Sequence, residues 1–217
     1  MFMGLVGSEM CIRDSQGSAA NHDGQARTVT TPSGPAQRAM LRDALKDAGI
    51  RPHQVDFIET HGTGTPLGDP IEVSAIGRVF CEDRENALYL GAVKANVGHL
   101  DSAAGIAGLI KVVLSLQHKT IPLHRNFSEP NRHIPWDDWP IEIPLENTAW
   151  GGKERFAGIS AFGMSGTNVH IIVGETPEPS VSNEKQPPTS GAKQLFTLSA
   201  RTEAVSYTHL TLPTKDS

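Results

Sequence analysis

The segment VDFIETHGTGTPLGDPIEVSAIGRVF, residues 55–80, joins an apolar run to a loop of glycine and threonine and then to an amphipathic stretch. The apolar run indicates a short buried strand within residues 54–60, because turn-forming residues bound it on both sides. We expect Asp69 to cap the helix that follows, with Pro70 in its first turn and Glu72 completing a capping box. This helix is predicted to bury three apolar residues, Ile76, Val79 and Phe80.

A second helix is predicted upstream, within residues 32–50. Ser33 and Pro35 are residues that open helices, and Gly49 is a residue that ends them. The predicted apolar face of this helix consists of Met40, Leu41, Ala44, Leu45 and Ala48.

Further strands and one more helix complete the expected pattern. Apolar runs predict strands at 87–93, 155–160 and 169–175. A helix rich in alanine and glycine is expected before His118. Glycine costs about 1 kcal/mol in a helix interior, so Gly105 and Gly108 indicate the close approach of another backbone. Strands that alternate with helices and end in a hairpin predict a layered α/β fold.

The composition of the 217 residues excludes several classes of protein. A net charge of −5 argues against a nucleic-acid platform, which needs clustered lysine and arginine. Two cysteines, Cys11 and Cys81, suggest neither a disulfide framework nor a zinc motif, and they fit a reducing compartment such as the cytoplasm. The sequence has no apolar run of 18 residues, so we predict no membrane span. The first residues lack the basic region of a signal peptide.

Two histidines occupy the positions where ligands bind in open α/β sheets. His61 and His99 each follow a predicted strand and precede a predicted helix. Glycines beside His61 allow close approach to the backbone, and Thr63 and Thr65 offer hydroxyl groups. Lys94 precedes His99, and a cation there disfavours protonation of a nearby imidazole. Two neutral imidazoles aimed at one point can stabilise an enolate or an oxyanion.

Two other interpretations of these loops stay open. The stretch GTGTPLG, residues 62–68, has a weak likeness to a dinucleotide-binding turn, but the negative charge of Asp69 opposes a pyrophosphate there. A Walker loop is excluded because no GK[ST] follows. Metal binding by His61 and His99 has no support from a helical HxxxH pattern or a nearby cysteine, so no metal site is predicted.

Three ordered motifs carry a resemblance to a known family. They are residues 55–80, residues 90–127 (LGAVKANVGHLDSAAGIAGLIKVVLSLQHKTIPLHRNF) and residues 157–173 (AGISAFGMSGTNVHIIV). Together they resemble the C-terminal half of a β-ketoacyl synthase domain of modular type I polyketide synthases. This resemblance implies a thiolase-like α/β fold, of which the chain carries the C-terminal half. In an intact domain the two halves form five layers, α-β-α-β-α, and the domain is usually a homodimer.

The same resemblance implies an acyltransferase that performs a decarboxylative Claisen condensation. A cysteine is acylated, a malonyl-type extender on the phosphopantetheine arm of an acyl carrier protein loses carbon dioxide, and the enolate attacks the acyl thioester. By motif, His61 and His99 match the histidines that polarise the extender carbonyl. Lys94 matches the lysine that tunes this pair.

Four more residues match positions that contact the substrate. Thr63 and Thr65 correspond to hydroxyls that contact the pantetheine arm. Met164 lies where many fatty-acid synthases carry a gating phenylalanine, and its backbone N–H corresponds to an oxyanion donor. Phe162 lines the same turn. The methionine departs from the fatty-acid pattern and agrees with the polyketide subtype.

The resemblance also implies that the nucleophile lies outside this chain. Cys11 has none of the family's surrounding pattern, and Cys81 is expected to pack at a helix end. The chain alone is therefore expected to be inactive. It would need an N-terminal ketosynthase half, and an acyltransferase domain is expected downstream. A fragment that exposes the face its other half should cover is also expected to have low solubility.

The resemblance divides the chain into four parts. Residues 17–175 correspond to the C-terminal ketosynthase half, and residues 176–205 to the linker toward an acyltransferase domain. Residues 1–16 and 206–217 resemble translated adapter sequence and are predicted to be non-native tails. Two other functions remain open, a non-catalytic docking or chain-length partner of ketosynthase type and a nucleotide-binding enzyme.

Overall fold

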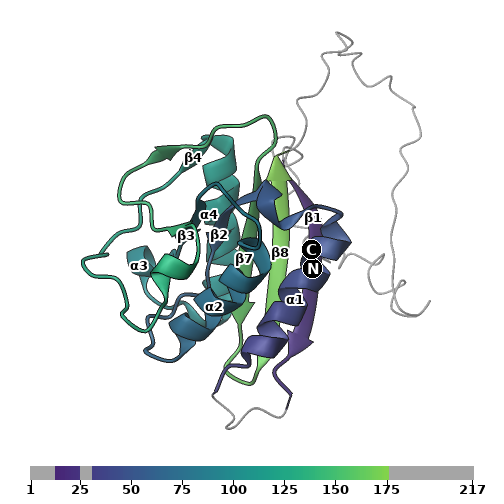
Figure 1. The fold of residues 1–217 in the computed structure, drawn as a ribbon, viewed down its shortest axis with the longest axis vertical. Coiled ribbons are helices and arrows are strands. Elements are labelled where there is room, and N and C mark those ends of the chain that lie inside the picture. The colour runs from purple at the N-terminus through teal and green to yellow at the C-terminus, as the bar shows by residue number, and fades with distance from the viewer. Residues whose placement is uncertain (1–12, 25–30, 176–217) are drawn as a thin grey trace, which may run out of the picture. The chain divides into compact units, whose positions relative to one another are not determined.

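A six-stranded mixed sheet forms the centre of the protein in this computed structural model, which describes residues 13–24 and 31–175 (Figure 1). Along the sheet the strands are β1 (Arg13–His22), β8 (Thr167–Glu175), β7 (Phe156–Phe162), β2 (Val55–Glu59), β3 (Leu88–Gly91) and β5 (Ile141–Glu142). Strands β7, β2, β3 and β5 are parallel, whereas β8 runs antiparallel to both of its neighbours. A separate antiparallel pair consists of β4 (Thr120–Ile121) and β6 (Thr148–Ala149).

Helices connect the strands and cover both faces of the sheet. The α-helices are α1 (Gly34–Ala48), α2 (Gly68–Phe80), α3 (Lys94–Val97) and α4 (Ala104–Gln117). Short 3-10 turns are η2 (Pro52–Gln54), η3 (Asp101–Ala103) and η4 (Trp136–Asp138). The predicted α/β class and the predicted strands and helices are confirmed.

The ends of α1 follow the prediction from sequence. The Ser33 side chain accepts a hydrogen bond from the backbone N–H of Ala36 at 3.3 Å, which satisfies a free donor of the first turn. Gly49 ends the helix in the left-handed region with φ 67°, a conformation that costs glycine little. The apolar face of α1 packs on the sheet, where Met40 and Ala44 are fully buried.

The start of α2 differs from the prediction. The helix begins at Gly68, its N-cap is Leu67, and no side chain caps it. Asp69 lies inside the first turn, and its carboxylate accepts the backbone N–H of Gly64 at 3.1 Å. Glu72 closes no capping box because its carboxylate is turned toward the loop after β2. The predicted burial of the apolar face of α2 is confirmed.

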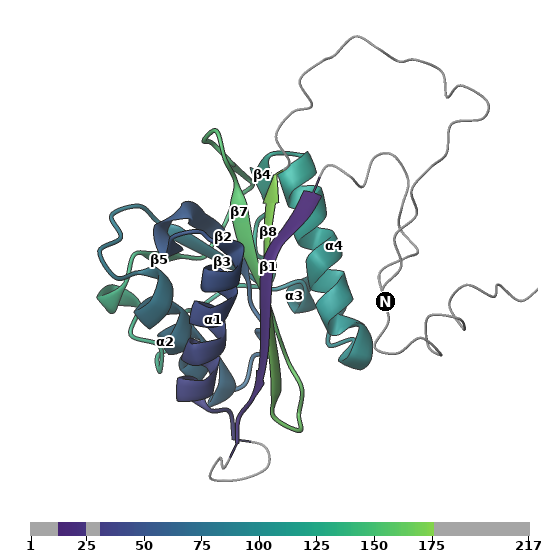
Figure 2. The same ribbon diagram turned by 90° about the vertical axis from the view of Figure 1, so that its right-hand side faces the viewer.

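The two faces of the sheet are covered by different helices, as Figure 2 shows. α1 and α2 pack on one face around a cluster of large buried side chains that includes Met40, Ile58 and Phe80. α4 packs on the opposite face through Val112 and Leu116. The glycines of α4 lie close to side chains, rather than to another backbone as expected. An added Cβ on Gly105 would meet the side chain of Ala161, and one on Gly108 would meet that of Glu59.

Strand β1 begins at Arg13, earlier than the start of the folded region predicted at residue 17. The backbone of Arg13 pairs with that of Glu175 on β8, so residues 13–16 are part of the sheet. These residues belong to the predicted N-terminal tail because they resemble translated adapter sequence, and their assignment as non-native stays a prediction. Cys11, the linker at 176–205 and the tail at 206–217 lie outside the described residues. Within the described residues, no helix has the length and apolar character needed to cross a membrane.

Candidate active site

The loops that carry His61 and Lys94 leave the sheet side by side. β2 and β3 are parallel neighbours, so their carboxyl ends lie at the same edge of the sheet. Both the backbone N–H and the hydroxyl of Thr60 donate to the carbonyl of Gly91, at 2.8 and 2.9 Å. This double contact joins the residue after β2 to the last residue of β3 and fixes the offset between the two loops.

A buried carboxylate holds the backbone of the His61 loop. Glu72 on α2 is 4% exposed, and its two oxygens accept the backbone N–H groups of His61 at 2.7 Å and Gly62 at 3.0 Å. Burial raises the pKa of Glu72 to about 7, although both backbone donors and Lys94 oppose this shift. The sequence analysis missed this role. The available signal was the position of Glu72 on the same face of the helix as the buried residue Ile76.

The His61 ring is held in one neutral form. Its Nδ1 accepts the backbone N–H of Phe162 at 3.3 Å, so the ring proton lies on Nε2. Burial lowers the pKa of His61, and the neighbouring Lys94 and His99 add to this shift, so that together they bring the pKa to about 4. At neutral pH His61 is therefore an uncharged hydrogen-bond donor at Nε2.

The His99 ring lies next to that of His61, with centroids 5.7 Å apart and planes at 82°. Its Nδ1 accepts the backbone N–H of Asp101 at 2.9 Å, which places the proton of the neutral ring on Nε2. The Asp101 carboxylate is 3.8 Å from the same Nδ1 and nearly fully exposed, so it makes at most a weak ion pair. The site thus contains two adjacent imidazoles whose Nδ1 atoms are occupied and whose Nε2 atoms are free to donate.

Six of the seven residues selected from sequence line one cleft of about 500 Å³. They are His61, Thr63, Thr65, His99, Phe162 and Met164. Lys94 instead lines a neighbouring cavity of about 460 Å³, on which Thr63 also borders. Lys94 therefore influences His61 through its charge. Burial lowers the pKa of Lys94, whereas the carboxylates of Glu72 and Glu59 raise it.

The turn between β7 and β8 forms one wall of the cleft. The Phe162 ring lies 5.2 Å from the His61 ring, centroid to centroid. Met164 is 84% exposed at the tip of this turn. The Gly163 N–H donates to the Thr167 carbonyl at 2.7 Å, which closes the turn. The wall therefore has a fixed aromatic base and a projecting thioether side chain.

A second polar contact supports this wall and was not predicted. The buried side chain of Asn168 donates to Asn21 at 3.2 Å and to Asp23 at 2.7 Å. These contacts tie the end of β1 to the start of β8, next to the turn between β7 and β8. They join residues far apart in the chain, so no local pattern in the sequence could reveal them.

Within the described residues, no cysteine lines the cleft and no group of side chains forms a metal centre. Cys81 packs in the core against α1 and α2, as expected, and burial raises the pKa of its thiol to about 11. It therefore has little thiolate character at neutral pH. In the part of the chain that the structure describes, no three His, Cys, Asp or Glu side chains are grouped so that they could hold a metal ion.

Comparison with known proteins places this geometry in a family. Residues 14–128 match the family model described as the C-terminal domain of β-ketoacyl synthase, and residues 130–212 match the ketoacyl-synthetase C-terminal extension. The chain belongs to the β-ketoacyl synthase family and carries its C-terminal domain with this extension. The extension model reaches past residue 205, where the linker was expected to end.

The relatives of the chain are modular polyketide synthases. It is 46% identical over 192 residues to erythronolide synthase EryA3 of Saccharopolyspora erythraea, covering 86% of this chain and 6% of that protein. It is 40% identical over 195 residues to the pikromycin synthase component PikAIII of Streptomyces venezuelae, covering 87% of this chain and 12% of that protein. The chain therefore spans only a small part of these relatives.

Solved ketosynthases share its fold. The ketosynthase from module 6 of the bacillaene synthase of Bacillus subtilis 168 superposes with a TM-score of 0.71 at 40% identity. That match covers 74% of this chain and 30% of the solved one. The oxazolomycin ketosynthase domain OzmH KS7 of Streptomyces albus JA3453 gives a TM-score of 0.73 at 32% identity, covering 78% and 32%. The predicted thiolase-like fold class is thereby confirmed.

Proposed function

We propose that this chain supplies the two-histidine part of an active site for decarboxylative Claisen condensation in polyketide synthesis. The observation that carries the proposal is the pair of adjacent imidazoles, His61 and His99, with ring centroids 5.7 Å apart, Nδ1 atoms that accept backbone N–H groups, and Nε2 atoms left to donate. Donors that are already oriented toward a developing negative charge stabilise it without reorganisation. This arrangement fits an enolate oxygen.

The proposed reaction uses these donors on a malonyl-type thioester. Nε2–H groups of His61 and His99 donate to the thioester carbonyl oxygen, which accepts the electron pair released when the carboxylate leaves as carbon dioxide. The enolate carbon then attacks an acyl-cysteine thioester. A carbon–carbon bond forms, the carbon–sulfur bond breaks, and the cysteine leaves as a thiolate.

Lys94 keeps the site in its working protonation state. Its positive charge is one of the causes that lower the pKa of His61, after burial itself. A charged imidazolium would lose a proton to the enolate, whereas a neutral ring donates a hydrogen bond and stays unchanged. Lys94 thus acts on the reaction through His61.

The cleft is proposed to receive the phosphopantetheine arm of an acyl carrier protein. Thr63 and Thr65 line it next to His61, and their hydroxyls suit the amide groups of such an arm. On the opposite wall, Phe162 is proposed to contact the substrate. Met164 is proposed to contact it as well, and its backbone N–H to serve as an oxyanion donor.

The acylated cysteine is proposed to come from an N-terminal ketosynthase half. The outer side of α4 supports such a partner, because Ile106, Ile110 and Leu114 are exposed on it at helical spacing. We further propose that the intact domain is a cytoplasmic homodimer and that an acyltransferase domain follows it. The isolated chain is then inactive in condensation.

The test is to join this chain to the N-terminal half of a related ketosynthase and to supply acyl- and malonyl-carrier protein. We expect carbon–carbon bond formation by the joined domain and none by the 217-residue chain alone. His61→Ala or His99→Ala should each lower the rate of carbon dioxide release roughly 10²–10³-fold, as loss of one oxyanion donor does elsewhere.

Two outcomes would contradict the proposal. Turnover by the chain alone that Cys81→Ala abolishes would place the nucleophile within it. A joined domain that folds and binds carrier protein but releases no carbon dioxide would favour the non-catalytic docking or chain-length role.

A further inference from the structure

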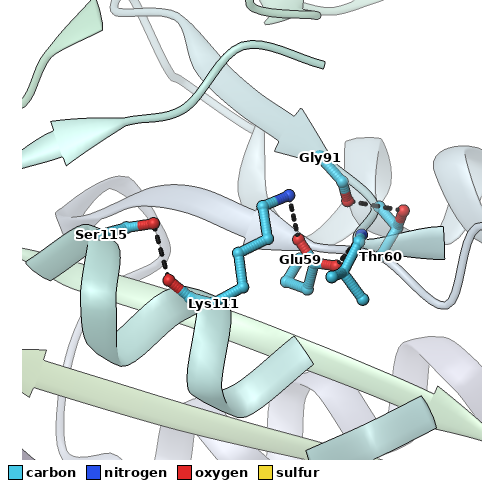
Figure 3. Close-up of polar contacts among 6 residues, drawn as sticks. Glu59, Thr60, Gly91, Lys111 and Ser115 are labelled. Carbon is cyan, nitrogen blue, oxygen red and sulfur yellow. Dashed lines mark hydrogen bonds and ion pairs between the residues drawn. The ribbon is translucent and has the colours of Figure 1, made fainter. Parts of the chain in front are cut away.

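A buried ion pair lies directly behind the candidate site. Glu59, the last residue of β2, is 2% exposed, and its Oε2 accepts a hydrogen bond from Lys111 Nζ at 2.7 Å. Figure 3 shows the lysine reaching from α4 to the strand end. The other carboxylate oxygen, Oε1, accepts the backbone N–H of Val93. Both oxygens of Glu59 are therefore engaged by groups from different parts of the chain.

These contacts join the three segments that carry the histidines and the lysine of the site. Glu59 lies on the strand that leads into His61. Val93 is the N-cap of α3 and directly precedes Lys94. Lys111 belongs to α4, the helix that follows His99. The Glu59 carboxylate is thus a common attachment point for all three segments.

Two glycines and an aromatic ring lie close to the side chains of this pair. An added Cβ on Gly108 would lie 3.1 Å from Glu59 Cγ, and one on Gly91 would lie 2.9 Å from Lys111 Nζ. The Lys111 ammonium also lies 5.4 Å from the centroid of the Phe57 ring. The two glycines and the ring therefore lie close against the pair on these sides, while Lys111 also borders a cleft of about 580 Å³.

We propose that Glu59 is a positioning residue, which holds the Lys94 turn and the α4 helix against the strand that carries His61. This proposal rests on the proposed function only in treating His61, His99 and Lys94 as the residues of the active site. A buried ion pair is weak as a source of stability, because desolvation of both charges offsets their attraction. The role of the Glu59 carboxylate is therefore geometric: it holds the turn at Val93 in place.

Two matched double variants separate positioning from charge and from stability. E59Q/K111M and E59L/K111M both remove the two opposite charges and keep side chains of similar size. Only the glutamine retains an oxygen that can accept the Val93 N–H. A difference between the two variants therefore reports the loss of this one attachment.

The readout is the titration of His61 in the 217-residue chain, followed by NMR of the imidazole protons. In E59Q/K111M we expect the pKa of His61 to stay at about 4. In E59L/K111M the Lys94 turn is released and the Lys94 charge moves away, so the pKa should rise by the part of the shift that Lys94 causes and stay below the ordinary 6.5, because burial, the larger cause, remains. Equal His61 titration in two folded variants would overturn the proposal.

A second measurement needs no substitution and covers the case in which E59L/K111M does not fold. Amide hydrogen exchange of the unmodified chain should show a protected Val93 N–H, and fast exchange at Val93 would also overturn the proposal. Both measurements are independent of catalysis. An inactive joined domain with these results intact would refute the proposed function and leave the role of Glu59 standing.

Discussion

The two faces of the central sheet differ in how completely this chain covers them. On one face, α1 and α2 enclose fully buried side chains such as Met40 and Phe80. On the other face, the inner side of α4 is buried at Leu116, while Ile110 and Leu114 on its outer side are 50% and 47% exposed. A helix that is apolar on all sides is normally buried on all sides. The first face is therefore covered within this chain, whereas the helix on the second face leaves apolar side chains exposed, as expected if the proposed N-terminal half packs against it.

The largest expected effect is on the face that α1 and α2 cover. Met40→Ala should lower the free energy of unfolding by about 2–5 kcal/mol, because it removes a fully buried side chain and leaves a cavity. Denaturant unfolding of the 217-residue chain, followed by circular dichroism, measures this loss.

The matched control lies on the outer side of α4. Ile110→Ala removes a half-exposed side chain and should change the free energy of unfolding by less than about 0.5 kcal/mol. If the two variants lost equal free energy of unfolding, the outer side of α4 would have to be buried within this chain. The two faces of the sheet would then not differ in how completely they are covered.

A smaller effect concerns a buried histidine. His170 is fully buried, packs 6.0 Å from the Phe80 ring, and its Nδ1 shares a hydrogen bond with the Ser160 hydroxyl at 2.9 Å. Burial lowers the pKa of His170 to about 3, below the 6.5 of the unfolded chain. As the pH falls, the unfolded state therefore binds the proton before the folded state does. The contribution of His170 to the free energy of unfolding is fully present above pH 6.5, and below it this contribution falls by about 1.4 kcal/mol per pH unit.

The comparison with His170→Asn isolates this contribution. Glu72, whose pKa is raised to about 7, binds its proton more readily in the folded state and so acts in the opposite direction. His61 acts in the same direction as His170. Glu72 and His61 are both unchanged in the His170→Asn variant, so their effects cancel in the comparison. Urea unfolding at pH 6.5 and 4.5 should show a shallower acid loss for His170→Asn than for the exposed control His133→Asn. If the two variants lost the same free energy of unfolding between pH 6.5 and 4.5, His170 would have to be accessible to protons in the folded state.

The smallest effect on stability is expected for substitutions on the exposed outer side of α4. The same substitutions are expected to have the clearest effect on self-association. Replacement of Ile106, Ile110 and Leu114 by serine removes exposed apolar area from α4 and should change folding stability little. We expect the unmodified chain to self-associate and the triple variant to be monomeric in sedimentation velocity. An unmodified chain that is monomeric at high concentration would contradict the view that this face packs against a partner.

Much of the fold and part of the site could be predicted from local patterns. Ser33 and Gly49 mark the ends of α1 because capping depends on residues close in sequence. The positions of His61 and His99 after strands were enough to place both rings at one edge of the sheet. The patterns failed at α2, where the carboxylate of Glu72 turns inward to the loop instead of capping its own helix.

The sequence by itself determined the order of strands and helices, the loops that carry the two histidines, and the resemblance to the ketosynthase family. Only the tertiary structure decided which carboxylates are buried and which tautomer each ring adopts. Phe162 donates to His61 across 101 positions of the chain, and Glu59 meets Lys111 across 52. The physical reason is that a carboxylate is normally exposed, and only donors brought together by distant strands and helices make its burial stable.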